Sequence, residues 1–228
     1  MITGIIGAMQ IETDALKAMV KEPICETVSG VEFVRGYIGK QEVVVAQCGI
    51  GKVFAALCAQ TMILRYGVGR IINTGVAGTL CEELGLLNVA VSTAVVEHDM
   101  DTSPLGDPVG LISGINIVQL PADKALCDLV CRAAVQLGVT CVQGVIASGD
   151  QFIADPQKKQ YIHETFDAVA CEMEGAAVGH VCYVNQIPFV VVRCISDNAD
   201  DKAGSMDYPE LCRRAAVQSQ RLIEEILS

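Results

Sequence analysis

Two acidic motifs in the last third of the chain hold the side chains most able to do chemistry. The first is CEMEGAA at residues 171–177, and the second is SDNAD at residues 196–200, after the apolar run PFVVVRCI. In a helix that begins near Glu172, the side chains of Glu172 and Glu174 point about 200° apart and cannot share a face. We therefore expect the two acids to have different functions.

We expect one acid to lie in the solvated first turn, where it complements the helix dipole. The other should lie in the packed interior, beside Met173 and small residues. A buried carboxylate needs a partner, and a substrate hydroxyl is one candidate. The alternative is that both acids simply favour a helix N-terminus. Asp197 favours the chemical interpretation, because it ends a predicted buried parallel strand, at the edge where open α/β sheets bind ligands.

Turns that contain glycine follow several of the predicted strands. They lie at residues 49–51, at residues 75–78 and at Gly149. Each allows a tight turn or a close approach of the backbone to a ligand, and such turns can converge on one pocket. Glu12 follows a similar turn at the start of the first predicted helix. Two interpretations of Glu12 remain open, a solvated first-turn acid and an acid of the site.

Several familiar catalytic patterns are missing from the sequence. No turn matches G-x-G-x-x-G or the P-loop, which gives little support to a dinucleotide or nucleoside triphosphate site. The three histidines have no spacing for a metal or a nucleophilic triad, and Cys127 and Cys131, one helical turn apart, have no matching second pair. We therefore expect no cofactor, no metal and no covalent hydrolase chemistry.

The composition indicates one globular domain over residues 1–228, with 51% hydrophobic residues. No apolar run reaches the roughly 20 residues of a membrane helix. The net charge of −11 disfavours nucleic acid and anionic membranes as partners, so we expect a small ligand. The cysteines lie mostly in apolar runs and the start lacks a basic signal region, which favours the cytoplasm. The apolar content also favours a homodimer.

Strand and helix patterns alternate along the chain, which predicts an α/β fold of three layers, α/β/α, with a mixed, mostly parallel central sheet. Strands are expected at residues 2–8, 31–38, 41–47, 70–73, 89–97, 142–147, 168–171 and 189–195. Helices are expected at residues 10–20, 52–66, 124–137, 156–165, 174–185 and 208–227. Residues 98–114 lack periodicity and contain many turn formers, so we expect a lid or binding loop there.

Six motifs, in this order, resemble those of a known family. They are GIIGAMQIE (4–12), CGIGKV (48–53), INTGVAG (72–78), SGDQFI (148–153), EMEGAA (172–177) and PFVVVRCISDNAD (188–200). From residue 1 to about 225 the chain resembles the 5'-methylthioadenosine/S-adenosylhomocysteine nucleosidases of the nucleoside phosphorylase superfamily. EMEGAA followed by ISDNAD is the most specific part of this resemblance.

The resemblance implies a nucleoside phosphorylase-like domain that hydrolyses the N-glycosidic bond of an adenine nucleoside, with no cofactor. Asp197 would protonate purine N7, and Glu12 would activate the attacking water. Glu174 and the backbone of Met173 would bind the ribose hydroxyls, with Met9 beside the sugar. Two carboxyl groups would then flank a bond that breaks through an oxocarbenium-like state, as in inverting glycosidases.

The resemblance also implies the remaining walls of the pocket. Phe152 would stack on adenine, the backbone of Ile153 would pair with its Watson–Crick edge, and Ser196 would orient the neighbouring aspartate. The other residues expected to bind substrate are Ile50, Val76 and Tyr208.

The chain departs from the family pattern in three places. Val76 stands where many relatives have Ser, Tyr208 replaces a Phe, and residues 104–107 replace an aromatic segment that lines the 5' pocket, in part across the dimer. These changes leave the preferred 5' group open.

Two rival functions remain: a purine nucleoside phosphorylase and a non-catalytic nucleoside-binding protein. A phosphorylase needs fixed cations for phosphate, and Lys52 is the only cation in a glycine turn, with no Arg beside these turns.

Overall fold

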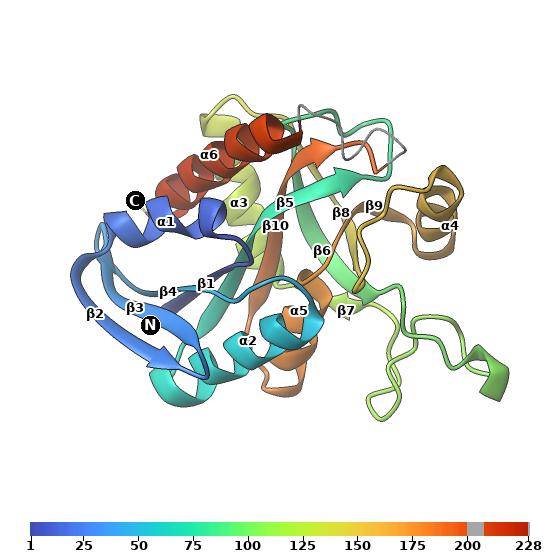
Figure 1. Cartoon of the computed structure of the whole chain (residues 1–228), viewed down its shortest axis with the longest axis horizontal. Helices are drawn as coiled ribbons and strands as arrows, with labels where there is room; N and C mark the ends of the chain where they lie inside the picture. The colour runs from blue at the N-terminus through green and yellow to red at the C-terminus, as the bar shows by residue number, and fades with distance from the viewer. Residues whose placement is uncertain (200–207, 228) are drawn as a thin grey trace.

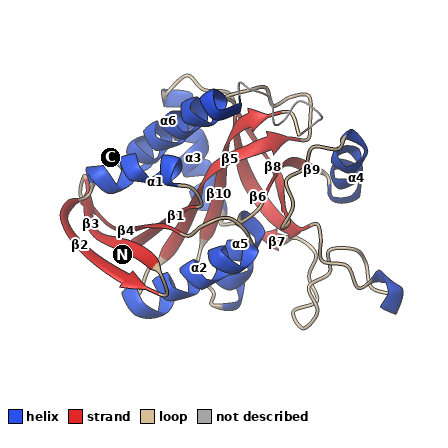
Figure 2. Cartoon of the chain, in the orientation of Figure 1, coloured by secondary structure: helices blue, strands red, loops and turns tan. Residues whose placement is uncertain are grey.

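A computed structural model describes residues 1–199 and 208–227 of the chain and shows a central sheet between two layers of helices (Figures 1 and 2). Its described strands form one sheet of ten. They are β1 (Thr3–Gly7), β2 (Lys21–Val28), β3 (Val31–Ile38), β4 (Gln41–Gln47), β5 (Arg70–Thr79), β6 (Val89–Glu97), β7 (Leu120–Pro121), β8 (Cys141–Ser148), β9 (Ala168–Glu172) and β10 (Phe189–Asp197).

The described helices cover both faces of this sheet. They are α1 (Gln10–Met19), α2 (Lys52–Tyr66), α3 (Lys124–Gln136), α4 (Pro156–Phe166), α5 (Gly175–Val184) and α6 (Tyr208–Leu227). Helices α1, α3 and α6 pack on one face, and α2 and α5 pack together on the other (Figure 1). Each face encloses its own hydrophobic core, as expected when helices bury an apolar stripe against a sheet. The predicted α/β/α fold is confirmed.

The sheet is mixed, and its pairings explain where a site can form. Strand β1 pairs in parallel with β4 and β5, and β5 also pairs in parallel with β10. Antiparallel pairs join β2, β3 and β4, and they also join β10 to β6 and β5 to β9. Strand β8 also pairs in parallel with β6 and with β9, so the described strands form the expected mixed sheet. The carboxyl ends of β1, β4, β5 and β10 open on one edge, where α/β sheets place ligands.

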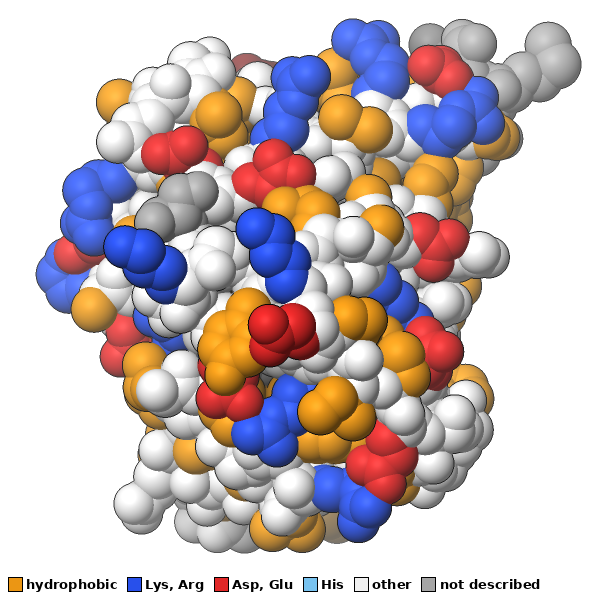
Figure 3. Space-filling model, turned by 90° about the vertical axis from the view of Figure 1, so that its left-hand side faces the viewer, with side chains coloured by type: hydrophobic (Ala, Val, Ile, Leu, Met, Phe, Trp, Pro, Cys, Tyr) orange, Lys and Arg blue, Asp and Glu red, His pale blue; other side chains and the backbone are white. Residues whose placement is uncertain are grey.

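Two strands, β2 and the short β7, were not predicted, and β5 and β10 are longer than predicted. Strand β2 was not expected, because most of its side chains are exposed and give no alternating pattern. It lies at the edge of the sheet, where Pro23 and mixed charges oppose pairing with another chain. Figure 3 shows acidic and basic side chains interspersed on this side of the molecule. Strands β5 and β10 run past residues 73 and 195, so that TGVAG and Ser196 to Asp197 belong to the sheet.

Residues 98–114 form most of the long connection between β6 and β7. A short 3-10 turn, η1 (Ser103–Leu105), is the regular structure described within it. The connection extends away from the sheet (Figure 1). None of the described residues 98–114 lines the pocket considered below, so the expected lid does not close over the site within one chain. Among the described helices, none is both long and apolar enough to cross a bilayer.

Candidate active site

A pocket of about 610 Å³, its open mouth included, lies at the carboxyl ends of the central strands. It brings together all eleven residues that the sequence predicted for a site, from seven separate stretches of the chain. These residues are Met9, Glu12, Ile50, Val76, Phe152, Ile153, Met173, Glu174, Ser196, Asp197 and Tyr208. No lysine or arginine is among the described residues that line it.

Glu12 sits at the floor of this pocket and is buried, so it is not a solvated first-turn acid. One oxygen, Oε2, accepts hydrogen bonds from the backbone N–H groups of Ala8 (2.9 Å) and Met9 (2.8 Å). The other, Oε1, accepts one from the N–H of Val76 (3.0 Å). Burial raises the pKa of Glu12, although these three bonds oppose the rise. A carboxylate with a raised pKa is suited to act as a general base.

Strand β5 approaches the two predicted catalytic acids at two glycines. A Cβ atom on Gly75 would lie 2.6 Å from Oε1 of Glu12, and one on Gly78 would lie 2.7 Å from Oδ1 of Asp197. A side chain at either position would therefore push the carboxylate out of its place. Three residues of strand span roughly 10 Å, so the two carboxyl groups meet β5 at places about that far apart. This spacing accounts for the glycines of TGVAG.

Asp197 ends β10 and is buried against β5. Its Oδ2 accepts a hydrogen bond from the hydroxyl of Ser196 (2.9 Å), and its Oδ1 accepts one from the N–H of Ala199 (2.8 Å). A bulge in the β10 to β5 register occurs between Ile195 and Asp197. Bulges redirect side chains near active sites, and this one places two consecutive residues, Ser196 and Asp197, in the pocket wall.

Glu172 and Glu174 do not lie on one helix, and the sequence interpretation of this pair was wrong. Glu172 is the last residue of β9, and α5 begins only at Gly175. Both acids are buried. Glu172 accepts hydrogen bonds from the N–H groups of Glu174 (3.0 Å) and Gly175 (2.8 Å) and from the hydroxyl of Ser148. It therefore holds the start of α5 in place from inside the protein, which a solvated acid cannot do.

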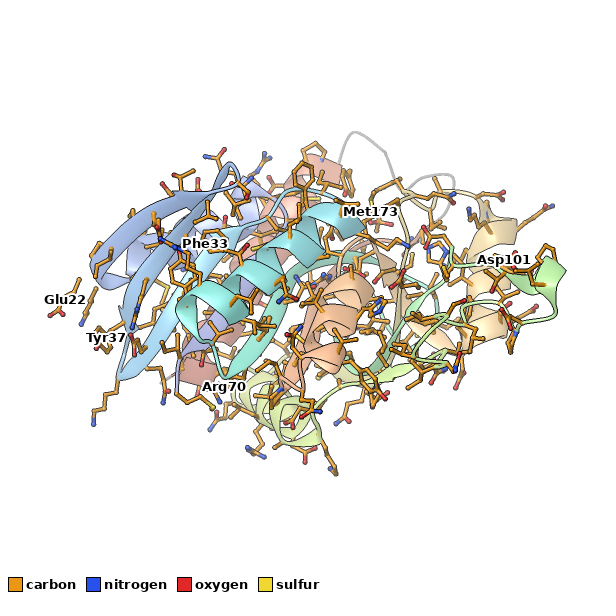
Figure 4. The ribbon with its side chains drawn as sticks, turned by 90° about the horizontal axis from the view of Figure 1, so that it is seen from below. Glu22, Phe33, Tyr37, Arg70, Asp101 and Met173 are labelled. Atoms are coloured by element: carbon orange, nitrogen blue, oxygen red, sulfur yellow. The ribbon has the colours of Figure 1, made fainter. Side chains whose placement is uncertain are left out.

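Both Glu172 and Glu174 line the pocket, but Glu174 makes fewer hydrogen bonds to the protein. Its Oε1 accepts a hydrogen bond from the N–H of Gly51 (2.8 Å), at the turn before α2. Burial, and then the nearby Glu172, raise the pKa of Glu174 to about 7. Figure 4 shows the neighbouring Met173 beside the N-terminal end of α2, with Asp101 far away on the projecting connection. A carboxyl group with one oxygen held by the protein has its other oxygen available for a ligand hydroxyl.

Sequence reasoning missed Arg193, which lies on β10 and is fully buried. Its guanidinium donates to Glu172 and to the side chain of Asn73. Burial opposes its charge, but the carboxylates of Glu172, Glu174 and Glu12 outweigh burial and raise its pKa. One buried cation thus balances part of the charge of three acids. An Arg in an apolar strand was the available signal, because such a residue is rarely buried without a partner.

Lys52, the first residue of α2, makes contacts at the end of β6 and just after β8. Its ammonium group contacts Glu97 (3.0 Å) and Asp99 (2.7 Å) at the end of β6. Its backbone N–H donates to Asp150 (2.8 Å), which follows β8. The cation therefore points away from the pocket and is already paired with two carboxylates. Among the described residues, no cluster of three or more His, Cys, Asp or Glu side chains can hold a metal ion.

The rim of the pocket is apolar. Phe152 and Tyr208 meet edge to face, with ring centroids 5.8 Å apart. Ile50 and Phe152 are both about half exposed, at 57% and 52%. Aromatic and aliphatic walls with a few polar groups at the base are typical of small-molecule sites. Val76 contributes its backbone N–H to Glu12 and places an aliphatic side chain, not a hydroxyl, in the lining.

The charge at Glu174 gives a stability prediction with a defined sign. From about pH 4.5 to pH 7 the unfolded chain loses this proton while the folded chain keeps it, so wild-type stability falls as pH rises through that window. Glu174→Gln has no such proton. The free energy of unfolding of Glu174→Gln, relative to that of the wild type, should therefore grow by on the order of 3 kcal/mol between pH 4 and pH 8. Urea unfolding at both pH values measures it, with the exposed Glu164→Gln as control; equal growth in the control would contradict the prediction.

Removing the buried cation should destabilise the fold. Arg193→Met leaves Glu172 buried without its partner, and breaking a buried ion pair in this way costs about 3–5 kcal/mol. Arg213→Met, which breaks an exposed pair with Glu210, should cost less than about 1 kcal/mol. Urea unfolding compares the two variants. A loss at Arg193 no larger than that at Arg213 would show that the guanidinium does not support the acids.

Comparison with known proteins defines the class of this one. The family profile described as the phosphorylase superfamily matches residues 2–228. The chain therefore belongs to the phosphorylase superfamily. Within it, the protein of Shewanella sediminis named 5'-methylthioadenosine/S-adenosylhomocysteine nucleosidase is 37% identical over 226 residues, which is 98% of this chain and 97% of that protein. The family predicted from the motifs is thereby confirmed.

Solved structures give the same result for the fold. A mutant of the Helicobacter pylori nucleosidase, crystallised with 5'-methylthioadenosine in the active site, matches with a TM-score of 0.93 at 35% identity, over 98% of this chain and 96% of that chain. Native futalosine hydrolase of the same organism matches with a TM-score of 0.93 at 34% identity, over 99% and 96%.

Proposed function

We propose that this protein is a nucleosidase that hydrolyses the N-glycosidic bond of 5'-methylthioadenosine, S-adenosylhomocysteine and related 5'-substituted adenine nucleosides, with release of adenine. The observation that carries this proposal is one pocket that is lined by the acids Glu12, Glu174 and Asp197 and has an apolar rim. The similar nucleosidases support the same reaction. Water supplies the oxygen that joins the sugar, and no cofactor takes part.

Each acid has its own step in the proposed mechanism. Asp197 donates a proton to N7 as the bond to the sugar lengthens, so that adenine leaves as a neutral molecule. Glu12, held by three backbone N–H groups, takes a proton from the attacking water. Glu174 accepts from a ribose hydroxyl through the oxygen that Gly51 does not hold. General acid and base help of this kind is worth about 10²- to 10⁴-fold each.

The walls of the pocket select the substrate in the same proposal. Phe152 stacks on adenine, the backbone of Ile153 meets its Watson–Crick edge, and Met9 and the Met173 backbone contact the sugar. Ile50 and Tyr208 stand near the 5' group, where each buried CH₂ contributes about 0.8 kcal/mol. We therefore expect 5'-methylthioadenosine to be the best substrate, with S-adenosylhomocysteine and 5'-deoxyadenosine within about 10²-fold and adenosine a poor substrate.

A product assay tests this function. Adenine release is followed with a panel of adenine nucleosides that differ at the 5' position, and futalosine is added because of the similar hydrolase. A preference for adenosine or inosine would overturn the substrate assignment. The absence of any base release would leave a non-catalytic nucleoside-binding protein as the alternative.

The same assay with and without phosphate separates a nucleosidase from a phosphorylase. Phosphate binding needs fixed cations or several converging N–H groups. The described lining contains no Lys or Arg, Lys52 is paired with two acids, and Arg193 lies beneath the pocket in contact with Glu172. Turnover should therefore be equal in both conditions, with a free sugar as the second product. A sugar 1-phosphate would identify a phosphorylase.

We also propose that two copies of the chain form a homodimer. Helix α2 presents exposed apolar side chains along its length, and these are Val53, Phe54, Leu57 and Leu64. A contiguous exposed apolar surface is typical of an interface. Sedimentation should give a dimer at micromolar concentration and mostly monomer for Leu57→Glu. Val135→Glu, on the exposed face of α3, should remain dimeric. A monomeric wild-type protein would contradict the proposal.

The cytoplasm is the proposed location. All eleven cysteines are free thiols, which suits a reducing compartment. The partner in this setting is the small nucleoside, and the net charge of −11 disfavours nucleic acid.

A further inference from the structure

Two thiols meet where α3 packs against the start of β8. The Sγ atom of Cys131, on α3, lies 3.4 Å from the Sγ atom of Cys141, the first residue of β8. The connection between the two elements is short, because Gly138 adopts a φ of 67° and turns the chain back at the end of the helix. Both cysteines are partly exposed. A disulfide of about 2.05 Å then needs an approach of only about 1.4 Å.

We propose that Cys131 and Cys141 form a reversible dithiol site that reacts with low-molecular-weight disulfides. The thiolate of Cys131 attacks one sulfur of the small disulfide, which releases one small thiol and leaves a mixed disulfide. Cys141 then loses its proton and attacks Sγ of Cys131, and the bond to the second small thiol breaks. Two protein thiols are oxidised and one small disulfide is reduced to two thiols, so atoms and electrons balance.

The surroundings assign the order of attack. The side-chain amide of Gln143 donates a hydrogen bond to Sγ of Cys131 (3.2 Å), so a polar donor at the surface faces the sulfur that attacks first. Burial and the neighbouring Cys131 raise the pKa of Cys141 to about 12. In the mixed disulfide, Cys131 can no longer carry charge, so one cause of that rise disappears. Cys141 therefore becomes easier to ionise when its attack is required.

Cys127, one turn earlier on α3, does not compete for the reaction. It is buried, and its thiol donates a hydrogen bond to the carbonyl oxygen of Ser92 (2.8 Å). Access as well as ionisation controls which thiols react. Cys25, exposed on the edge strand β2, is the natural reference for simple mixed-disulfide formation.

The dithiol site lies away from the pocket. Strand β8 begins at Cys141 and ends at Ser148, whose hydroxyl contacts Glu172. Seven strand steps place these ends roughly 23 Å apart. Oxidation should therefore leave the pocket unchanged, and the site does not depend on the reaction proposed above. Any catalytic turnover then serves as a check that the oxidised protein is folded.

Mass spectrometry of the whole chain tests the site. The reduced protein is treated with glutathione disulfide, alkylated and digested with trypsin, which cuts after Arg132, between the two cysteines. We expect peptides 125–132 and 133–158 to be joined, the thiols of Cys131 and Cys141 to be lost, and no lasting glutathione on either peptide. Lasting glutathione on Cys131, or a link through Cys127, would overturn the proposal. Cys127→Ser, which should still form the link, settles the assignment within peptide 125–132.

Single variants separate the two roles. Cys141→Ser should trap glutathione on Cys131, and Cys131→Ser should abolish both the link and any adduct on Cys141. Cys25→Ser should form the link as the wild type does. A glutathione adduct on Cys141 in the Cys131→Ser protein would reverse the assigned order and contradict the proposal. Circular dichroism shows whether each variant is folded, and the alanine variant at the same position replaces any serine variant that is not.

Discussion

Asp197→Asn should lower kcat for adenine release by about 10²- to 10⁴-fold and leave the fold and nucleoside binding largely intact. The amide oxygen can still accept a hydrogen bond from Ser196 or Ala199. It cannot deliver a proton to N7. A free aspartate is mostly ionised at neutral pH, so Asp197 must take up a proton in the pocket before it can pass one to N7, which gains basicity in the transition state. The loss should therefore appear in kcat more than in binding.

A substrate change separates this role from a structural one. A 7-deaza-adenine nucleoside has no N7 to protonate, so the wild type and Asp197→Asn should process it at similar, low rates. Asp155→Asn, which changes a helix-capping acid of α4 outside the pocket, is the matched control and should retain its rate. Binding of adenine by calorimetry reports whether the pocket survives. Retention of more than a few per cent of wild-type kcat in Asp197→Asn would remove it as the general acid.

The sequence predicted the pocket well because its residues lie at the ends of strongly apolar strands. The run PFVVVRCI predicts a buried strand, and whatever follows such a strand in an α/β fold comes to the ligand edge. Asp197 and Ser196 follow it. The glycines of TGVAG signalled close backbone approach, and the structure identifies the approaching groups as Glu12 and Asp197. Motif order supplied the family, and the family supplied roles that local pattern alone left open.

The charge network below the pocket could not be predicted from pattern. Helical geometry made Glu172 appear to be a first-turn acid, because nothing in CEMEGAA marks the point where β9 ends and α5 begins. Its partners, Ser148 and Arg193, lie 24 and 21 residues away in the chain. Tertiary contacts decide which acid is satisfied internally and which faces the ligand. Strand β2 escaped prediction for a related reason, since an exposed edge strand has no buried face to impose alternation.

Glu12→Gln should be the other variant with a very large effect, a loss of about 10²- to 10⁴-fold in kcat/KM. All three groups that surround the Glu12 carboxylate are donors, the N–H groups of Ala8, Met9 and Val76. A glutamine cannot match them, because its NH₂ group must face at least one N–H. The variant therefore loses the base and one backbone contact together. Asp14→Asn, an exposed change on the same helix, should stay within about twofold.

The pH profile and a rescue experiment isolate the base from the lost contact. Burial raises the pKa of Glu12, and a base works only when ionised, so wild-type kcat/KM should rise with pH through that raised pKa. Glu12→Gln should lack this acidic limb. In Glu12→Ala the space left by the side chain should admit formate or azide, which can act as a small external base or nucleophile and restore part of the rate. Glu174→Ala should not respond, because in the proposed mechanism the Glu174 carboxyl group binds the sugar and does not activate water. An unchanged acidic limb in Glu12→Gln would assign the activation of water to another residue.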